Sequence, residues 1–300
     1  PGYRHWPRWL RGYLDRPQVL AWASQFAVRT RAADLGPMTV SVLSGGEGKH
    51  AEEIRSLAEI VRAEEPDVVL VANSLLLGFV PTLRRAGGFR IVCQVQGEDG
   101  FLDELPNPWR ERAIGLMRSH AGLVDRFLAP SHPHAQDMAE RLGVSVERFA
   151  VLPHPAPLAE PMPLPEGPPM LGHLSSIRRA KGLDILLRAM ARLPSELRLR
   201  IGGKVVERDF YDEIRRLAAP LGDRVVFEGE IAPSEKAAFF RSVDAVVLPS
   251  RLRESRGIVA LEALAHARPV VVSDAGVFAE FAAKSPGILL HSPGNVDELV

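Results

Sequence analysis

Short apolar runs alternate with longer segments of helical period along most of the chain, and this alternation restricts the folds open to it. Apolar runs of Val, Ile and Leu are typical of buried strands, and apolar residues three and four apart are typical of helices that cover a sheet. Strands that are apolar along their whole length occur where helices cover both faces of a parallel sheet. The pattern therefore predicts α/β domains with doubly wound parallel sheets. The expected strands are residues 39–43, 68–71, 91–95, 127–129, 170–174, 197–201, 225–228, 245–248 and 270–273.

A proline-rich stretch, residues 153–169, divides this alternation into two series. It holds eight prolines in seventeen positions, and proline lacks the amide that donates hydrogen bonds in helices and sheets. Such a run stays extended and suits an interdomain linker. We therefore expect an N-terminal Rossmann-like domain over residues 1–152, the linker over 153–169 and a C-terminal Rossmann-like domain over 170–300.

The charge balance indicates no nucleic-acid partner. Lys plus Arg and Asp plus Glu number 37 each, so no overall field attracts nucleic acid or anionic lipid. The single cysteine, Cys93, lies in an apolar run and cannot form an intrachain disulfide, which fits a reducing compartment. We expect a cytoplasmic protein. Trp6 and Trp9, near the start, leave contact with the inner face of a membrane open, although packing on their own domain is the preferred interpretation.

Several other patterns in the sequence suggest different functions, but none of them has the residues or the spacing that its function requires. Residues 44–50, SGGEGKH, lack the first glycine of a P-loop and the Ser or Thr after its lysine, so they are interpreted as a glycine-rich turn that starts a helix. No GxGxxG follows a strand, so a nicotinamide or flavin cofactor has no support. His132 and His134 are two apart at a helix start and cannot share a metal. Capping by Ser131 and surface exposure explain them better.

The strongest chemical signal is the segment AVVLPSRLRESRGIVALEALAHARPVVVSDAGVFAEF, which reads strand, loop, helix, strand, loop, helix. Glu254 lies in the first loop and Gly257 opens the helix. The free amides from Gly257 to Val259 present a positive helix end to an anion such as a diphosphate. Glu262 leans back toward the helix start, where its carboxylate can accept hydrogen bonds from vicinal ribose hydroxyls.

This E-x7-E arrangement, with LEAL and RPVV after it, resembles the retaining glycosyltransferases of family 4, or glycosyl transferases group 1. These enzymes have the GT-B fold, in which two Rossmann-like domains face a cleft. LGHLSSIRRAKGLDILLRAM resembles the first strand and helix of the donor domain, and IVCQVQGEDGFLDELP resembles an acceptor-domain loop. The chain does not open on a strand, and we expect parts of both terminal segments to be missing.

The resemblance implies transfer of a sugar from a nucleoside diphosphate sugar to an acceptor hydroxyl, with retention at the anomeric carbon and without cofactor or metal. The absence of any Asp-x-Asp pair agrees with a metal-independent enzyme. Lys181 and Glu254 are the implied catalytic residues, Lys181 holding the departing diphosphate and Glu254 orienting the sugar. The implied donor site comprises Arg178, Lys181, Gly202, Gly203, Glu254, Gly257, Ile258, Val259 and Glu262.

Two places depart from the family's pattern. Ser176 stands where the family has its phosphate arginine, with Arg178 and Arg179 two and three residues on. The acceptor-side loop lacks the histidine that many members carry and offers Gln96, Gly97 and Glu98 instead. Gln96 can hydrogen-bond a sugar hydroxyl but cannot shuttle a proton.

These departures keep two alternatives open. One is a nucleotide-sugar epimerase or phosphorylase on the same fold, and the other is a non-catalytic nucleotide-sugar-binding or scaffold protein. The acceptor can be a sugar, a lipid-linked sugar or a small molecule.

Overall fold

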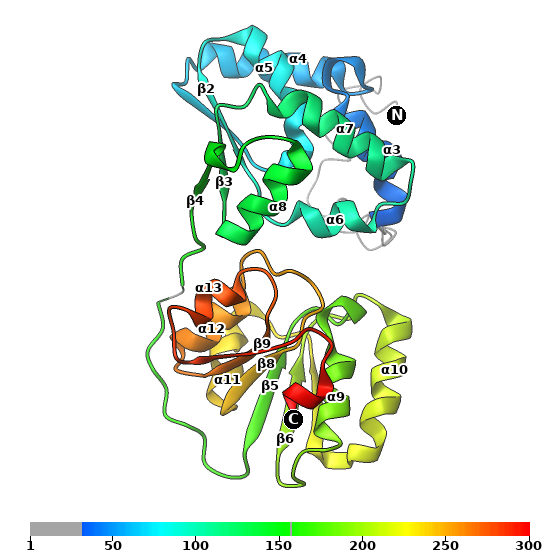
Figure 1. The fold of residues 1–300 in the computed structure, drawn as a ribbon, viewed down its shortest axis with the longest axis vertical. Coiled ribbons are helices and arrows are strands. Elements are labelled where there is room, and N and C mark those ends of the chain that lie inside the picture. The colour runs from blue at the N-terminus through cyan, green and yellow to red at the C-terminus, as the bar shows by residue number, and fades with distance from the viewer. Residues whose placement is uncertain (1–31, 157) are drawn as a thin grey trace, which may run out of the picture.

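The computed structural model describes residues 32–156 and 158–300, which form two parallel sheets surrounded by helices (Figure 1). The strands are β1 (Val68–Val71), β2 (Arg90–Gln94), β3 (Arg126–Ala129), β4 (Phe149–Val151), β5 (Met170–Leu174), β6 (Arg198–Gly202), β7 (Val225–Gly229), β8 (Ala245–Leu248), β9 (Val270–Ser273) and β10 (Ile288–His291). The first sheet has the order β1-β2-β3-β4, the second has the order β10-β9-β8-β5-β6-β7, and every pair is parallel. The predicted α/β class with parallel sheets is confirmed.

Helices connect the strands and cover the sheets. The α-helices are α3 (Gly36–Leu43), α4 (Ala51–Ala63), α5 (Val80–Ala86), α6 (Glu98–Glu104), α7 (Trp109–Ala121), α8 (His132–Leu142), α9 (Leu183–Met190), α10 (Arg208–Ala218), α11 (Lys236–Arg241), α12 (Ile258–Ala265), α13 (Phe278–Ala282) and α14 (Val296–Leu299). The short 3-10 helices are η2 (Ala32–Leu35), η3 (Gly45–Glu47), η4 (Ser74–Phe79), η5 (Val146–Arg148), η6 (Arg179–Lys181), η7 (Ala219–Arg224) and η8 (Pro233–Glu235). Within the described residues, no helix is both long and apolar enough to cross a membrane.

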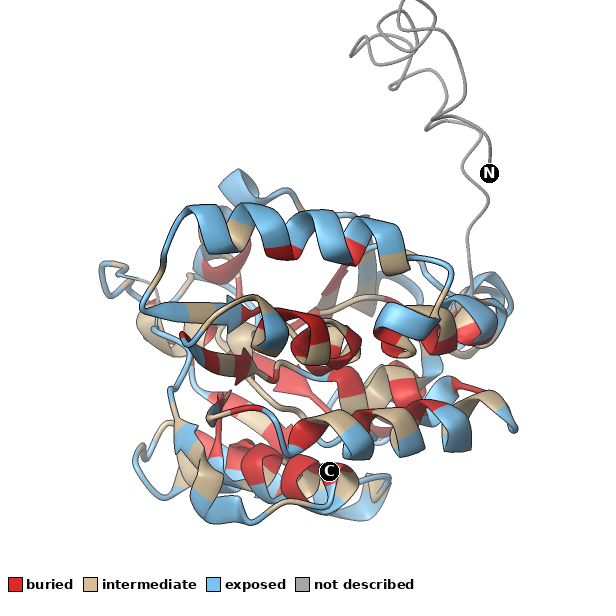
Figure 2. Ribbon diagram, turned by 90° about the horizontal axis from the view of Figure 1, so that it is seen from above, coloured by how far each residue is buried: buried red, intermediate tan, exposed pale blue. Residues whose placement is uncertain are grey.

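The cores lie between the sheets and their helices. In the second sheet, neighbouring residues of β8 point to opposite faces, so Val246 belongs to the cluster with Phe240 and Phe278 while Val247 belongs to the cluster with Phe210. In Figure 2, buried residues are found on the strands and on the inner faces of the helices. β8 is therefore apolar on both faces, as its sequence predicts.

The carboxyl ends of the two sheets face each other. In Figure 1, β4 leads down out of the first domain and β5 climbs back toward it. The other strands of the first sheet are parallel to β4, and the other strands of the second sheet are parallel to β5. In the second sheet the strand order reverses at β5, which lies between β8 and β6. Ligands of open parallel sheets bind outside the carboxyl ends of the strands at such a reversal.

One predicted strand is wrong. Residues 39–43 belong to the helix α3, which has Pro37 in its first turn and buries Gly36, Thr39, Val40 and Leu43. These buried positions are three and four apart, which is the helical period. The β-branched residues in this run resemble a strand locally, but packing against η4 and α7 favours the helix. Near the other end of the chain, β10 and α14 are not among the predicted elements.

A buried arginine joins the segment between the sheets to the second domain. From Leu152 to Pro169, the described residues form no helix or strand. Arg268 is fully buried and donates hydrogen bonds to the carbonyl oxygens of Met162 at 3.1 Å, Pro163 at 2.5 Å and Phe240 at 2.8 Å. The guanidinium therefore holds this extended segment against the end of α11.

Replacing Arg268 with methionine should destabilise the protein. Methionine keeps an unbranched side chain but donates nothing, so three carbonyl groups lose a charged donor, and we expect a loss of about 3 kcal/mol in the free energy of unfolding. Urea denaturation of Arg268→Met and of the wild type measures this loss in the free energy of unfolding. The control, Arg188→Met on the exposed face of α9, should change the free energy by less than about 0.5 kcal/mol. Equal midpoints for Arg268→Met and the wild type would contradict this account of the buried arginine.

Candidate functional site

An open cavity lies outside the carboxyl ends of β5 and β8, where the strand order reverses. It is lined by His173, Leu174, Ser175, Lys181, Leu248, Ser250, Glu254, Ser255, Arg256, Gly257, Ile258, Val259 and Phe278. Five of the predicted donor-site residues therefore line the same cavity: Lys181, Glu254, Gly257, Ile258 and Val259. The remaining predicted site residues do not line it.

The start of α12 forms one wall of the cavity. Gly257 precedes the helix in the left-handed conformation, with φ 59° and ψ 34°, and no side chain caps the helix. A Cβ atom on Gly257 would lie 2.8 Å from the ring of Phe281 and 3.0 Å from that of Phe278. Only glycine meets both demands without strain, and the uncapped amides of the first turn remain free to bind an anion.

The loops after β5 and β8 are joined by an ion pair. The Nζ atom of Lys181 lies 2.5 Å from Oε1 of Glu254, and the hydroxyl of Ser250 donates to the same oxygen at 3.0 Å. Lys181 and Glu254 are each only about a fifth exposed, 21% and 20%. Within the described part of the chain, Oε2 of Glu254 accepts no hydrogen bond, so one carboxylate oxygen remains available to a ligand.

Lys181 owes its position to the glycine that follows it. Gly182 has φ 71°, and a Cβ atom there would lie 1.8 Å from the carbonyl oxygen of Pro249. The backbone of the Lys181 turn thus lies directly against the loop that carries Glu254. This close approach requires glycine.

Glu262 has a lysine partner that the sequence pattern does not reveal. Both carboxylate oxygens accept from Nζ of Lys236, at 2.7 and 2.9 Å. Lys236 opens α11, and nothing in the spacing of residues 236 and 262 predicts their contact. Each oxygen keeps a lone pair for a further donor.

The two candidate phosphate arginines do not line the cavity. Arg178 lies 3.1 Å from Glu104 of the N-terminal domain, and its buried Nε atom has no hydrogen-bond partner among the described residues. Arg179 pairs with Glu213 and lies over the ring of Phe210. Each guanidinium is therefore committed to a carboxylate outside the cavity.

Gly202 and Gly203 support the wall of the cavity and do not line it. A Cβ on Gly202 would collide with Ile231 at 2.6 Å, and a Cβ on Gly203 would lie 1.6 Å from the carbonyl oxygen of Ser175. Because Ser175 lines the cavity, these glycines place β6 close behind it.

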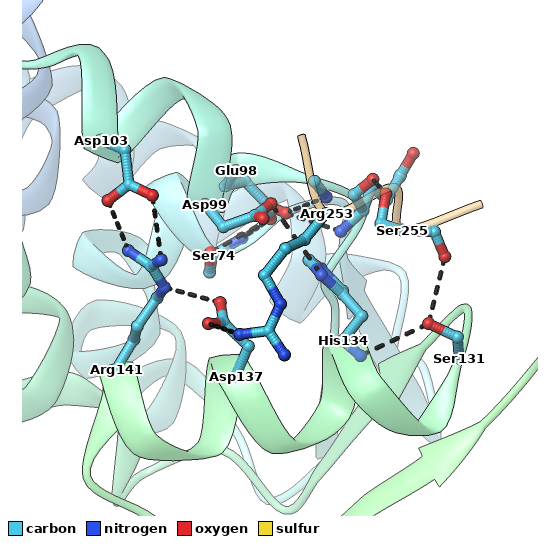
Figure 3. A network of polar contacts seen from close by, with 12 residues as sticks. Ser74, Glu98, Asp99, Asp103, Ser131, His134, Asp137, Arg141, Arg253 and Ser255 are labelled. Carbon is cyan, nitrogen blue, oxygen red and sulfur yellow. Dashed lines mark hydrogen bonds and ion pairs between the residues drawn. The ribbon is translucent and has the colours of Figure 1, made fainter. Parts of the chain in front are cut away.

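On the N-terminal side, Glu98 organises the loop after β2 (Figure 3). Its buried carboxylate accepts from the amides of Ser74 at 2.7 Å, Gln96 at 2.6 Å and Gly97 at 2.8 Å, and from the hydroxyl of Ser74 at 3.1 Å. The side-chain amide of Gln96 donates to the carbonyl oxygen of Ala72 at 2.9 Å. Glu98 therefore shapes the loop after β2 from within, while the side-chain oxygen of Gln96 accepts no hydrogen bond among the described residues.

Ser255 connects the two domains at the rim of the cavity. Its hydroxyl donates to the carbonyl oxygen of Gln96 at 3.1 Å, and its own carbonyl accepts from the hydroxyl of Ser131 at 3.1 Å. Arg253 approaches Asp137 of the N-terminal domain at 3.7 Å (Figure 3). The loop that carries Glu254 thus directly contacts the loops after β2 and β3 of the N-terminal domain.

The two histidines at the start of α8 behave differently from each other. Ser131 caps the helix by accepting from the amide of His134, as predicted. The side chain of His132 is 72% exposed and contacts Glu280 at 3.0 Å, whereas that of His134 is only 3% exposed, so the prediction of surface exposure is wrong for His134. His134 is buried because α8 packs that side against Asp99 of α6, 3.9 Å away.

Burial also shifts the pKa values of this pair. It lowers the pKa of His134, which favours the neutral imidazole, and it raises the pKa of Asp99. The Nε2 atom of His134 has no hydrogen-bond partner in the described residues. No three His, Cys, Asp or Glu side chains of the described residues gather closely enough to hold a metal ion.

His173, at the base of the cavity, is kept neutral by burial. Desolvation lowers its pKa to about 4, and Lys181 acts in the same direction. One ring nitrogen contacts the carbonyl oxygen of Val247 and the other the hydroxyl of Ser175, each at 2.8 Å. The imidazole therefore supports the wall of the cavity without adding charge.

Family models match both halves of the chain. Residues 5–160 match Glycosyltransferase Family 4, and residues 168–300 match Glycosyl transferases group 1. Among curated relatives, the D-inositol 3-phosphate glycosyltransferase of Xylanimonas cellulosilytica is 30% identical over 193 residues, which cover 58% of this chain and 46% of that protein. The lipopolysaccharide core biosynthesis mannosyltransferase LpcC of Rhizobium leguminosarum is 36% identical over 182 residues, 57% of this chain and 48% of that protein. The chain thus spans about half the length of these relatives.

Solved structures share the fold. Anabaena HepE in complex with UDP and glucose has a TM-score of 0.67 at 20% identity, covering 85% of this chain and 72% of that one. Sucrose-phosphate synthase from Thermosynechococcus elongatus has a TM-score of 0.66 at 22% identity, covering 84% and 68%. These likenesses confirm the predicted GT-B fold.

The neutral state of His173 makes stability depend on pH. Its folded-state pKa of about 4 lies below the ordinary value of 6.5, so the unfolded state binds the proton more readily and stability falls as pH falls below 6.5. Between about pH 7 and pH 5, His173 should account for a loss of roughly 2 kcal/mol. Urea denaturation at both pH values should show a smaller loss for His173→Gln than for the wild type. The same pH dependence in both proteins would rule this assignment out.

Proposed function

Because the chain belongs to glycosyltransferase family 4, we propose that it transfers a sugar from a nucleoside diphosphate sugar to an acceptor hydroxyl, with retention at the anomeric carbon. The observation that carries this proposal is that the uncapped start of α12, Lys181 and Glu254 converge on one cavity at the strand-order reversal. A helix start and an ammonium group both favour an anion, while a half-engaged carboxylate favours hydroxyl groups.

The diphosphate leaving group is stabilised at the start of α12. As the bond between the anomeric carbon and the phosphate oxygen breaks, negative charge grows on the diphosphate. Ile258 and Val259, with the free amides of the helix start, and Lys181, with its ammonium group, already line the cavity and need little rearrangement to stabilise that charge. Lys181 has three N–H donors, so it can serve a phosphate while it remains paired with Glu254.

The two glutamates bind the donor's hydroxyl groups. Oε1 of Glu254 is held by Lys181 and Ser250, which leaves Oε2 to accept from the transferred sugar. Glu262, oriented by Lys236, accepts from the ribose hydroxyls farther along α12. In this proposal Arg178, Gly202 and Gly203 act indirectly and do not contact the donor, because each lies behind or beside the cavity wall.

The acceptor approaches from the N-terminal domain, near Gln96 and Gly97. Its hydroxyl oxygen bonds to the anomeric carbon on the face that the diphosphate leaves, and its proton passes to the departing phosphate oxygen. Gln96 accepts a hydrogen bond from the acceptor through its free side-chain oxygen. Protein groups stabilise the charge on the diphosphate in this proposal, which therefore requires no metal and no cofactor.

Two relatives suggest the chemical class of the acceptor. LpcC is named for lipopolysaccharide core biosynthesis, and a 26% identical Corynebacterium glutamicum protein is named for mannosyl transfer from GDP-mannose to a phosphatidylinositol monomannoside. We therefore include lipid-linked sugars at the cytoplasmic face of a membrane among the acceptors to test first.

Substitutions of Lys181 and Glu254 test the proposal. Lys181→Ala and Glu254→Gln should each lower kcat by about 100- to 1000-fold, because each removes a group that acts on the transition state. The measurement is release of nucleoside diphosphate from UDP- and GDP-sugars in the presence of acceptor lipids and sugars. Lys284→Ala, a matched charge removal at an exposed position, should leave the rate unchanged. Wild-type rates in both site variants would refute the assignment, and consumption of nucleotide sugar without any acceptor would favour an epimerase.

A further inference from the structure

Arg256 stands apart from the other charged side chains of its segment. Five charged residues lie between positions 251 and 262, and four of them have an ion-pair partner: Arg251 with Asp184, Arg253 with Asp137, Glu254 with Lys181 and Glu262 with Lys236. Within the described part of the chain, Arg256 makes no hydrogen bond and no ion pair. No carboxylate of these residues therefore neutralises its positive charge.

Arg256 lies at a position where an unpaired positive charge is unfavourable. It lines the cavity, is partly buried, and immediately precedes Gly257 at the start of α12. The start of a helix is the positive end of its dipole, so a guanidinium there is repelled rather than stabilised. Lys181, another cation, lines the same cavity. Among the described residues no carboxylate pairs with Arg256 to compensate these repulsions, but an anion in the cavity would.

The other cations in and near the cavity, Lys181, Arg178 and Arg179, are each paired with a carboxylate. Lys181 is paired with Glu254, which lowers the net positive charge that it offers to a ligand. Arg178 and Arg179 are held by Glu104 and Glu213, outside the cavity. A diphosphate carries more than one negative charge, so the helix start and a half-neutralised lysine leave part of that charge unbalanced.

We propose that Arg256 binds the diphosphate of the nucleotide donor and supplies the arginine of the phosphate site from the start of α12. This inference rests on the proposed function and adds to it the residue that balances the remaining phosphate charge. A guanidinium presents its N–H groups in a planar fork that matches two phosphate oxygens, which a lysine ammonium cannot do. As the sugar departs, the growing charge on the outer phosphate strengthens this contact.

Binding of nucleotides that differ only in phosphate tests the proposal. Calorimetric titration first identifies which of UDP, GDP and ADP the wild-type protein binds. Arg256→Gln should raise the Kd of that nucleotide about 10- to 100-fold. The Kd of the corresponding nucleoside, measured by NMR titration, should be the same for Arg256→Gln and the wild type. Arg256→Lys should fall between the wild type and Arg256→Gln, because it keeps the charge and loses the fork. The control Arg216→Gln, on the exposed face of α10, should bind the diphosphate as the wild type does.

The possible results separate this inference from the function on which it rests. If the wild type binds a nucleoside diphosphate and Arg256→Gln binds it equally well, the role of Arg256 is overturned and the donor site stands. If the nucleoside and the diphosphate lose affinity equally, Arg256 acts on the fold of the site and the phosphate role is overturned. If the wild type binds none of the three nucleotides, both proposals fail.

Discussion

The ion pair between Lys181 and Glu254 is the contact around which the cavity is arranged. It joins the loop after β5 to the loop after β8, the two strands at which the order of the second sheet reverses. Gly182 allows these loops to approach, and Gly257 then turns the chain into α12 so that its first amides face the same space. The pair also leaves one Glu254 oxygen and two Lys181 donors unengaged, so the contact that holds the loops together can also bind a ligand.

The same loop also controls how the domains meet. Glu254 is followed by Ser255, whose hydroxyl and carbonyl groups reach the loops after β2 and β3 of the first domain. Glu98 stiffens the first of these loops from within by accepting from three amides, and Ser131 at the start of α8 anchors the second. The loops after β2 and β3 are therefore positioned relative to the cavity by hydrogen bonds of Ser255, the residue that follows Glu254. A ligand that moves this loop would also change the fit between the domains.

Local patterns in the sequence predict those parts of the structure that depend on local interactions. Runs that are apolar along their whole length identify most strands, and Gly257 and Glu254 identify one wall of the cavity. The run at residues 39–43 misleads because β-branched residues that are favourable in strands also suit one buried face of a helix, and the packing of α3 decides between them. Contacts between distant segments have no local pattern. Lys236 reaches Glu262 across 26 positions and Glu104 reaches Arg178 across 74, so neither partner is visible before the chain is folded.

A crystal structure of the protein soaked with UDP or GDP tests the central claim most directly. The account predicts electron density for the nucleotide in the cavity, with its outer phosphate about 3 Å from the amides of Ile258 and Val259 and within reach of Lys181. Its ribose should lie beside Glu262. Density for the nucleotide at any other place on the protein, with this cavity unchanged, would contradict the account.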